Sequence, residues 1–217
     1  RENTEDLYIG QEDAIEDGFV AKRVITRTAS ERIIRFAFEL AKKQKRKLVT
    51  AVHKANVLRK TDGLFLDIAR NIAKEYPEIM FEDMLVDSAA MRIIKSPEHF
   101  QILVTTNMFG DILSDEATAL VGGLGVVPSA NIGNDCALFE PVHGSAPKYA
   151  GKNIANPLAS FRSVEMMLEF LGETKVAGKL HLSFSRVLQK GIKTRDLGGS
   201  ATTTEFTQAV ITQLKTL

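Results

Sequence analysis

The sequence is 217 residues long, with 44% hydrophobic and 25% charged residues, which is typical of a globular protein. Its 28 Lys and Arg residues against 27 Asp and Glu residues give a formal net charge of +1, so no charge excess indicates nucleic-acid binding. The single cysteine, Cys136, excludes an intrachain disulfide framework and a cysteine-rich zinc site, and it fits a reducing compartment.

No apolar run reaches the roughly twenty residues that a membrane-spanning helix needs. The N-terminal segment RENTEDLYIG is charged and lacks the apolar core of a signal peptide. We therefore expect a soluble protein in the cytoplasm, or in the mitochondrial matrix if the source is eukaryotic. The sequence begins with Arg1 rather than methionine, so we expect the chain to come from a longer product.

The first 120 residues alternate between helical and strand periodicity. The pattern predicts helix 29–43, strand 48–53, helix 63–74, strand 79–86, helix 88–95, strand 102–106 and helix 109–120. Ser30 and Glu31 would open the first helix, and Asp62 would cap the second. Strands and helices that alternate at these lengths predict an α/β fold with parallel strand pairing.

The pattern changes near Val121. The stretch 122–133 is rich in turn-forming residues, a strand is predicted at 135–141, and helices are predicted at 158–171, 175–189 and 204–216. This half has few strands, so it resembles part of a domain whose other strands lie upstream. We expect one part to span residues 1–121 and the other 122–217.

Two acidic residues, Asp111 and Asp115, are candidate ligands of a divalent metal ion. They are four residues apart in a predicted helix, so both carboxylates project from one face. Mg²⁺ prefers oxygen ligands, and Asp87, at the end of a predicted strand, is a third candidate. Spacing alone favours a structural interpretation, with Asp111 at a helix start, Asp115 as a solvated charge and Asp87 as a helix N-cap.

Polar residues also follow the predicted strand 48–53. His53, Lys54 and Asn56 come at the carboxyl end of this strand, which is where α/β folds bind ligands. A lysine in such a place serves as a base only where burial or nearby cations favour its neutral form. The commoner alternative is a surface lysine.

The loop His143–Pro147, HGSAP, is a candidate phosphate-binding loop, because exposed backbone N–H groups of a glycine-containing loop bind anions. It is not a G-x-G-x-x-G motif, and the alternative is an ordinary turn that closes a strand. Arg1, whose guanidinium suits a carboxylate, and Tyr8, which can donate a proton, complete the candidates. Taken singly, each of these two is more simply explained as structural.

Six motifs then occur in a fixed order: RENTEDLY at 1–8, HKANV at 53–57, GDILSD at 110–115, the glycine-rich stretch at 122–133, FEPVHGSAP at 139–147 and NIANP at 153–157. Together they resemble the β-decarboxylating dehydrogenases, which act on isocitrate, homoisocitrate or 3-isopropylmalate. The resemblance covers essentially the whole chain and is closest to isocitrate dehydrogenase. It implies the α/β fold of that family, with 1–121 as the dimerisation and substrate domain and 122–217 as the cofactor-binding portion of an incomplete large domain.

The resemblance also implies a role for each matched residue. Arg1 would bind the malate-like part of the substrate, and Tyr8 would be the acid that protonates the product carbon. Lys54 would be the base, with Asn56 near the substrate and the nicotinamide. Lys54 and Asn56 would serve the active site of the partner subunit. The metal ligands would be Asp111 and Asp115 of one subunit and Asp87 from the other, and the cofactor-binding residues would be His143, Gly144, Ser145, Ala146, Lys148, Tyr149 and Asn156.

The implied activity is metal-dependent oxidative decarboxylation of a 2-hydroxy acid, with hydride transfer to NAD(P) and with Mg²⁺ or Mn²⁺. Isocitrate, giving 2-oxoglutarate in the tricarboxylic acid cycle, is the expected substrate, because RENTED resembles the isocitrate and homoisocitrate branches more than the isopropylmalate branch. The partners would be a small-molecule substrate and a second copy of the chain, in a homodimer or higher oligomer, without nucleic acid or membrane. The alternatives are homoisocitrate or 3-isopropylmalate as substrate, or a non-catalytic regulatory or truncated paralogue.

The resemblance favours NADP over NAD. NAD-dependent members carry an aspartate directly after HGSAP, which accepts hydrogen bonds from ribose hydroxyls and repels a 2′-phosphate. This chain has Lys148 and Tyr149 there, and Arg195 is the one candidate to replace the arginine that NADP enzymes add from a later helix. The family's upstream third, with its arginine-rich helix, is not in the sequence, so we expect residues 1–217 alone to show little or no turnover.

Overall fold

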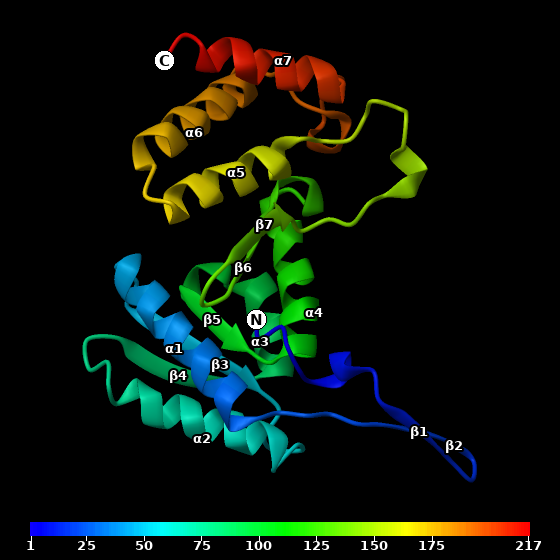
Figure 1. Cartoon of the computed structure of the whole chain (residues 1–217), viewed down its shortest axis with the longest axis vertical. Helices are drawn as coiled ribbons and strands as arrows, with labels where there is room; N and C mark the ends of the chain where they lie inside the picture. Colours follow the sequence, from blue (N-terminus) through cyan, green and yellow to red (C-terminus); the bar gives the residue numbers. More distant parts are fainter. The chain divides into compact units, whose positions relative to one another are not determined.

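The computed structural model describes all 217 residues and divides them into two compact units, Arg1–Ala117 and Thr118–Leu217 (Figure 1). The division falls at the end of helix α4 (Asn107–Thr118), which carries two of the candidate metal ligands, Asp111 and Asp115. None of the helices has the length and hydrophobicity needed to cross a membrane.

The first unit is built around a three-stranded parallel sheet in the order β4-β3-β5. Its strands are β3 (Leu48–His53), β4 (Met80–Leu85) and β5 (Ile102–Thr105). Parallel strands need crossover connections, and helices α2 (Thr61–Ala73) and α3 (Val86–Lys95) supply them, while α1 (Arg27–Lys43) precedes β3. The predicted α/β fold with parallel pairing is therefore confirmed.

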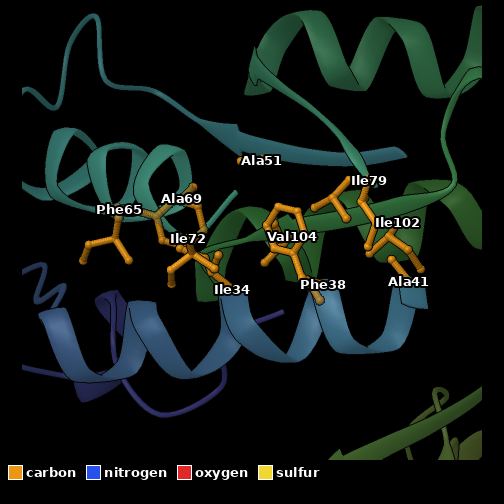
Figure 2. Packing of buried hydrophobic residues seen from close by; sticks show 13 residues of the cluster. Ile34, Phe38, Ala41, Ala51, Phe65, Ala69, Ile72, Ile79, Ile102 and Val104 are labelled. Carbon is orange, nitrogen blue, oxygen red and sulfur yellow. The ribbon is translucent and has the colours of Figure 1, made fainter. Parts of the chain in front are cut away.

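Helices cover both faces of this sheet. Side chains alternate across β3, so that Val49 and Ala51 pack with α1 and α2, whereas Val52 packs on the opposite face with α3 and α4. Figure 2 shows the first of these layers, in which Phe38 of α1 lies among apolar side chains from α2 and the sheet. Phe38 is fully buried, and burial of such a ring contributes about 2–3 kcal/mol.

The capping residues of two helices differ from the predictions. Helix α1 begins at Arg27, capped by Thr26, whose Oγ1 accepts from the backbone N–H of Ala29 at 3.2 Å, and Ser30 lies inside the helix. Asp62 is not a cap either, because it lies in the first turn of α2. Its side chain is fully buried and accepts a hydrogen bond from the backbone N–H of Lys54. Apolar spacing identifies the buried face of a helix, but the cap depends on where the chain enters it.

A hairpin appears where no element is predicted. Strands β1 (Glu12–Ile15) and β2 (Gly18–Ala21) pair in antiparallel fashion, and every residue of both strands is exposed. Ile15, Phe19 and Val20 are among its exposed apolar side chains. With neither face buried, the strands lack the alternation of apolar and polar residues by which strands are recognised.

The second unit combines a hairpin with three helices. Strands β6 (Pro128–Ile132) and β7 (Ala137–Pro141) pair in antiparallel fashion and pack on helix α5 (Leu158–Phe170), which contacts α6 (Thr174–Gln189), which in turn contacts α7 (Thr203–Leu214). Phe184 and Phe206 belong to its buried core. Strand β6 lies in the stretch that the sequence predicts to be rich in turns. Its residues Ser129 and Asn131 are common turn formers, so the sequence does not indicate a strand there.

Candidate active site

Residues 1–8 bring Arg1 and Tyr8 to the first turns of helix α4. The Arg1 guanidinium pairs with the Asp111 carboxylate, and its Nε donates to Asn107 Oδ1 at 2.9 Å. The Tyr8 hydroxyl donates to Asp111 Oδ2 at 2.6 Å, and the guanidinium of Arg1 lies 5.1 Å from the centre of the Tyr8 ring. Three predicted site residues from opposite ends of this unit's sequence therefore form one cluster.

Gly110 makes this approach possible. A Cβ atom at position 110 would lie 2.7 Å from Cγ and 2.8 Å from Cβ of Arg1, which is closer than side chains tolerate. The glycine of the GDILSD motif is thus explained by the passage of the Arg1 side chain over the helix. Because α4 begins at Asn107, Asp111 lies in the second turn, and its interpretation as a helix-start acid is wrong.

The electrostatics of the cluster keep Tyr8 in its acid form. The hydrogen bond to Asp111 raises the pKa of Tyr8 above its usual value, because ionisation would place a phenolate beside the carboxylate. Half of the Tyr8 side chain remains exposed, at 54%. A neutral phenol that solvent or a ligand can reach is the state required of a proton donor.

Lys54 and Asp87 form a second group in the same unit. Parallel pairing of β3 with β4 sets His53 beside Leu85, so the residues that follow both strands meet at one edge of the sheet. Lys54 Nζ donates to Asp87 Oδ1 at 2.7 Å, and this bond lowers the pKa of Asp87. Asp87 lies within the first turn of α3 rather than at its N-cap, which is Leu85.

The turn after β3 is held by His53. This histidine is buried, its Nδ1 accepts from the backbone N–H of Ala55 at 3.0 Å, and its Nε2 lies 3.3 Å from Asp83 Oδ2. An Nδ1 that accepts assigns the proton to Nε2. His53 therefore shapes the turn, and Asn56 lies exposed within that turn.

The three aspartates do not converge within one chain. Asp111 and Asp115 both belong to α4, whereas Asp87 belongs to α3 and pairs with Lys54. No group of three or more His, Cys, Asp or Glu side chains is placed to hold a metal ion. Two accessible carboxylates one turn apart match the one or two that Mg²⁺ commonly takes from a protein. The chain thus carries a donor set that fits a hard cation but supplies only part of a site.

The second unit contains a cavity of about 910 Å³, within the size range of small-molecule sites. Its lining includes most of the predicted cofactor residues, namely His143, Gly144, Ser145, Ala146, Tyr149 and Asn156. Arg195 also lines it, whereas Lys148 does not. Ala146 has a φ of 43°, a left-handed conformation that is uncommon for a residue with a side chain and frequent in ligand-binding loops.

Asp196 is the residue of this cavity that the sequence did not reveal. Its carboxylate accepts from Asn156 Nδ2 at 2.8 Å and from Thr194 Oγ1 at 2.6 Å. A Cβ atom at Gly125 would lie 2.9 Å from the same carboxylate, so this glycine makes room for it. The one available signal was its place beside Arg195 in the turn KTRDLGG.

A model of the family described as isocitrate/isopropylmalate dehydrogenase matches residues 1–210. The chain belongs to this family. A 3-isopropylmalate dehydrogenase of Methanothermobacter thermautotrophicus is 54% identical to it over 215 residues, which are 99% of this chain and 65% of that protein. A homoisocitrate dehydrogenase of Methanocaldococcus jannaschii is 55% identical over 215 residues, 99% of this chain and 62% of that protein.

The family fold is confirmed by a solved structure. The crystal structure of isocitrate dehydrogenase from Methylococcus capsulatus superposes with a TM-score of 0.94 at 47% identity, covering 98% of this chain and 65% of that one. The chain therefore has the α/β fold of the isocitrate/isopropylmalate dehydrogenases, as its motifs imply. It spans less than two thirds of the length of each of these three proteins.

Proposed function

We propose that this family member catalyses the oxidative decarboxylation of a 2-hydroxy acid with a malate core, isocitrate in the first place, with hydride transfer to NADP. The observation that carries the proposal is the cluster of Arg1, Tyr8 and Asp111. It places a carboxylate-binding cation and a protonated phenol each within hydrogen-bonding distance of a metal-type ligand. Those are the chemical functions that substrate binding, product protonation and metal-assisted oxidation require.

Each residue of the candidate site has a defined task in this reaction. Arg1 binds a substrate carboxylate, and its contact with Asp111 holds the guanidinium in place beforehand. Lys54 accepts the proton of the substrate hydroxyl, and Tyr8 delivers a proton to the carbon that loses carbon dioxide. Asp111, Asp115 and Asp87 would hold Mg²⁺ or Mn²⁺, which supplies polarisation of the substrate oxygens.

We infer that the active site is shared between two copies of the chain in a homodimer. Within one chain, Asp87 and Lys54 bond to each other and do not join Asp111 and Asp115. A second copy would bring the two halves together. The first unit also exposes apolar side chains suited to such an interface: Phe19 is 79% exposed, Met91 64% and Ile94 53%.

The cavity of the second unit is proposed to receive the adenosine end of the nucleotide. The loop 143–146 offers backbone N–H groups to the phosphates, and the Asn156 side chain, fixed by Asp196, faces the base. Arg195 on the wall and Lys148 beside Tyr149 provide positive charge for a 2′-phosphate, which favours NADP. NAD remains the second candidate, because the Asp196 carboxylate lies in the same cavity and would repel a nearby phosphate.

Homoisocitrate and 3-isopropylmalate are the alternative substrates. The relatives above carry names for each of the three acids at similar identity to this chain. All three acids share the malate core that Arg1 and the metal ligands would bind, and they differ in the third substituent. A non-catalytic paralogue is the alternative outside enzymology.

The test is steady-state turnover of the three acids by the intact protein, with Mg²⁺ and with either NADP or NAD. We expect the highest kcat/KM for isocitrate with NADP, and a shift toward NAD in Lys148→Asp. Asp111→Asn should lower kcat/KM by more than about 100-fold, because mutation of a residue that only hydrogen-bonds to a metal ligand already lowers metal affinity or activity 10- to 100-fold. Glu116→Gln, on the same helix, is the matched control and should retain activity.

Two outcomes would contradict the proposal. Absence of turnover with all three acids would favour the non-catalytic paralogue, and undiminished activity of Asp111→Asn would remove the metal assignment. Preference for homoisocitrate or 3-isopropylmalate would change the substrate and leave the reaction class intact.

A further inference from the structure

Arg23, in the segment between β2 and α1, is buried among carboxylates. Its side chain is 10% exposed, and those of Asp6 and Asp62 are 0% exposed. All five N–H groups of the guanidinium have acceptors: Nε reaches Asp6 at 2.6 Å, Nη2 reaches Asp6 at 3.2 Å and Thr106 Oγ1 at 2.9 Å, and Nη1 reaches Thr61 Oγ1 at 3.1 Å and Asp62. The residue therefore has no donor left for another role.

Asp6 also forms hydrogen bonds with two segments of the site. Its carboxylate also accepts from the backbone N–H of Leu7 at 2.9 Å, directly before Tyr8, and from that of Met108 at 3.2 Å, at the start of α4. Asp6 itself has a φ of 76°, a positive value that is uncommon in a residue with a side chain and that persists where the surrounding contacts fix it.

Asp62 reaches the third segment. Its Oδ2 accepts from the backbone N–H of Lys54 at 2.6 Å, so the guanidinium is one side chain away from the proposed base. The ring of Phe109, on α4, lies 5.1 Å from the guanidinium carbon and closes the remaining side. One cation thus joins the segments that carry Tyr8, Lys54 and the start of α4.

Fold stability alone is a weak reason for this arrangement. A buried cation between two buried carboxylates loses much hydration, and well-packed apolar side chains commonly stabilise a core as well or better. The charged cluster instead fixes the orientation of the groups around it, because the planar guanidinium holds five hydrogen bonds in one geometry.

We propose that Arg23 is a positioning residue that holds Tyr8, Lys54 and the beginning of α4 in their catalytic arrangement. The inference rests on the function proposed above, since it assigns the three segments to one reaction. Arg23 acts through Asp6, Asp62 and Thr106, without contacting substrate or cofactor.

The test is Arg23→Lys in the intact protein. Lysine keeps the charge but presents its donors from a single atom, so it cannot span Asp6, Asp62 and Thr106 together. We expect kcat to fall about 10- to 100-fold, as misplaced groups typically cost, with KM values changed by less than about threefold. Amide hydrogen exchange should accelerate at Leu7, Lys54 and Met108, with the core of β3 still protected.

Arg35→Lys is the matched control, since Arg35 forms a two-point pair with Glu75 in the same unit, at 2.6 and 2.9 Å, away from these segments. It should leave kcat and the exchange of Lys54 unchanged. An unchanged kcat in Arg23→Lys, or exchange that rises equally throughout β3, would overturn the proposal and leave Arg23 with a structural role.

A milder variant keeps the proposal testable if Arg23→Lys does not fold. Thr106→Val removes one acceptor and retains the shape, so it should lower kcat severalfold and accelerate exchange at Met108. Normal values of both would overturn the proposal. Failure of the proposed function would be seen separately, as absence of turnover by the unmodified protein.

Discussion

Asp111 acquires its role from side chains that are distant in sequence. By spacing alone, Asp111 is more simply explained as an acidic residue at a helix start. In the folded chain Arg1 and Tyr8 both bond to it, and Gly110 leaves room for the Arg1 side chain. At the scale of the residue, the contacts of Asp111 therefore depend less on its position in the helix than on the segment 1–8 that packs against that helix.

Glu2 anchors the segment that delivers Arg1 and Tyr8. Its buried carboxylate accepts from the backbone N–H and hydroxyl of Thr4, from the backbone N–H of Glu5, and from Arg32. Burial raises the pKa of Glu2, but these hydrogen bonds lower it by more, so the folded-state value is depressed. The carboxylate therefore stabilises the fold while it is ionised.

Glu2→Gln is expected to lower the free energy of unfolding at neutral pH by about 1.5–3 kcal/mol, the usual value of hydrogen bonds to a charged group. The contribution of a depressed pKa is present above the unfolded value, about 4.3 for Glu, and is lost as pH falls through the folded value. The difference between variant and wild type should therefore shrink in acid. Urea unfolding at several pH values measures it.

Glu98→Gln, at an exposed position, is the control and should show little difference at any pH. A stability difference for Glu2→Gln that stays constant from neutral pH into acid would contradict the assignment of the effect to ionisation.

At the scale of the element, helices and strands with a regular apolar pattern were predictable from the sequence, whereas elements without such a pattern were not. The helices of the first unit were predictable because each has one apolar face, and strands β3 and β5 because they are short apolar runs. The hairpin of β1 and β2 was missed because all of its residues are exposed, and β6 because its polar residues also form turns. Helix starts were displaced because a cap such as Thr26 depends on local chain direction.

Helix α7 offers a direct test of an element's end. Thr202 and Glu205 form a capping box: Thr202 Oγ1 accepts from the backbone N–H of Glu205 at 3.2 Å, and the Glu205 carboxylate accepts from the backbone N–H of Thr202 at 2.8 Å. The bond from this N–H lowers the pKa of Glu205. Thr202→Ala should lower the free energy of unfolding by about 1 kcal/mol.

The measurement is urea unfolding followed by circular dichroism at neutral pH, with amide exchange of the first turn of α7 as a local readout. Thr212→Ala, the same chemical change at an exposed position of that helix, is the control and should cause no loss, since alanine favours a helix interior. Equal effects of the two variants would show that the cap contributes nothing.

At the scale of the whole molecule, the proposed shared site makes a prediction that a single-chain site does not. Lys54→Ala and Asp111→Asn should each be inactive alone. Co-expressed, they should form mixed dimers in which one of the two sites is intact, restoring about a quarter of wild-type activity on random pairing. Turnover of the co-expressed protein measures this directly.

The control pair is Tyr8→Phe with Asp111→Asn, which would damage the same half of the site and should restore nothing. No recovery in the first pair, or sedimentation of the wild-type protein as a monomer, would contradict the shared site. Phe19→Asp, in the exposed hairpin of β1 and β2, is expected to weaken the dimer.

The sequence by itself determined the α/β class, the parallel pairing, the family and the residue types of the candidate site. These follow from local periodicity and from motifs that are each contiguous in the chain. Only the tertiary structure decided which of those residues meet, Tyr8 with Asp111 and Lys54 with Asp87, and it added Asp196 as the partner of Asn156. It also revealed Arg23, because a guanidinium satisfied by residues 6, 61, 62 and 106 has no local pattern. Contacts across such separations depend on packing, which leaves no periodicity in the sequence.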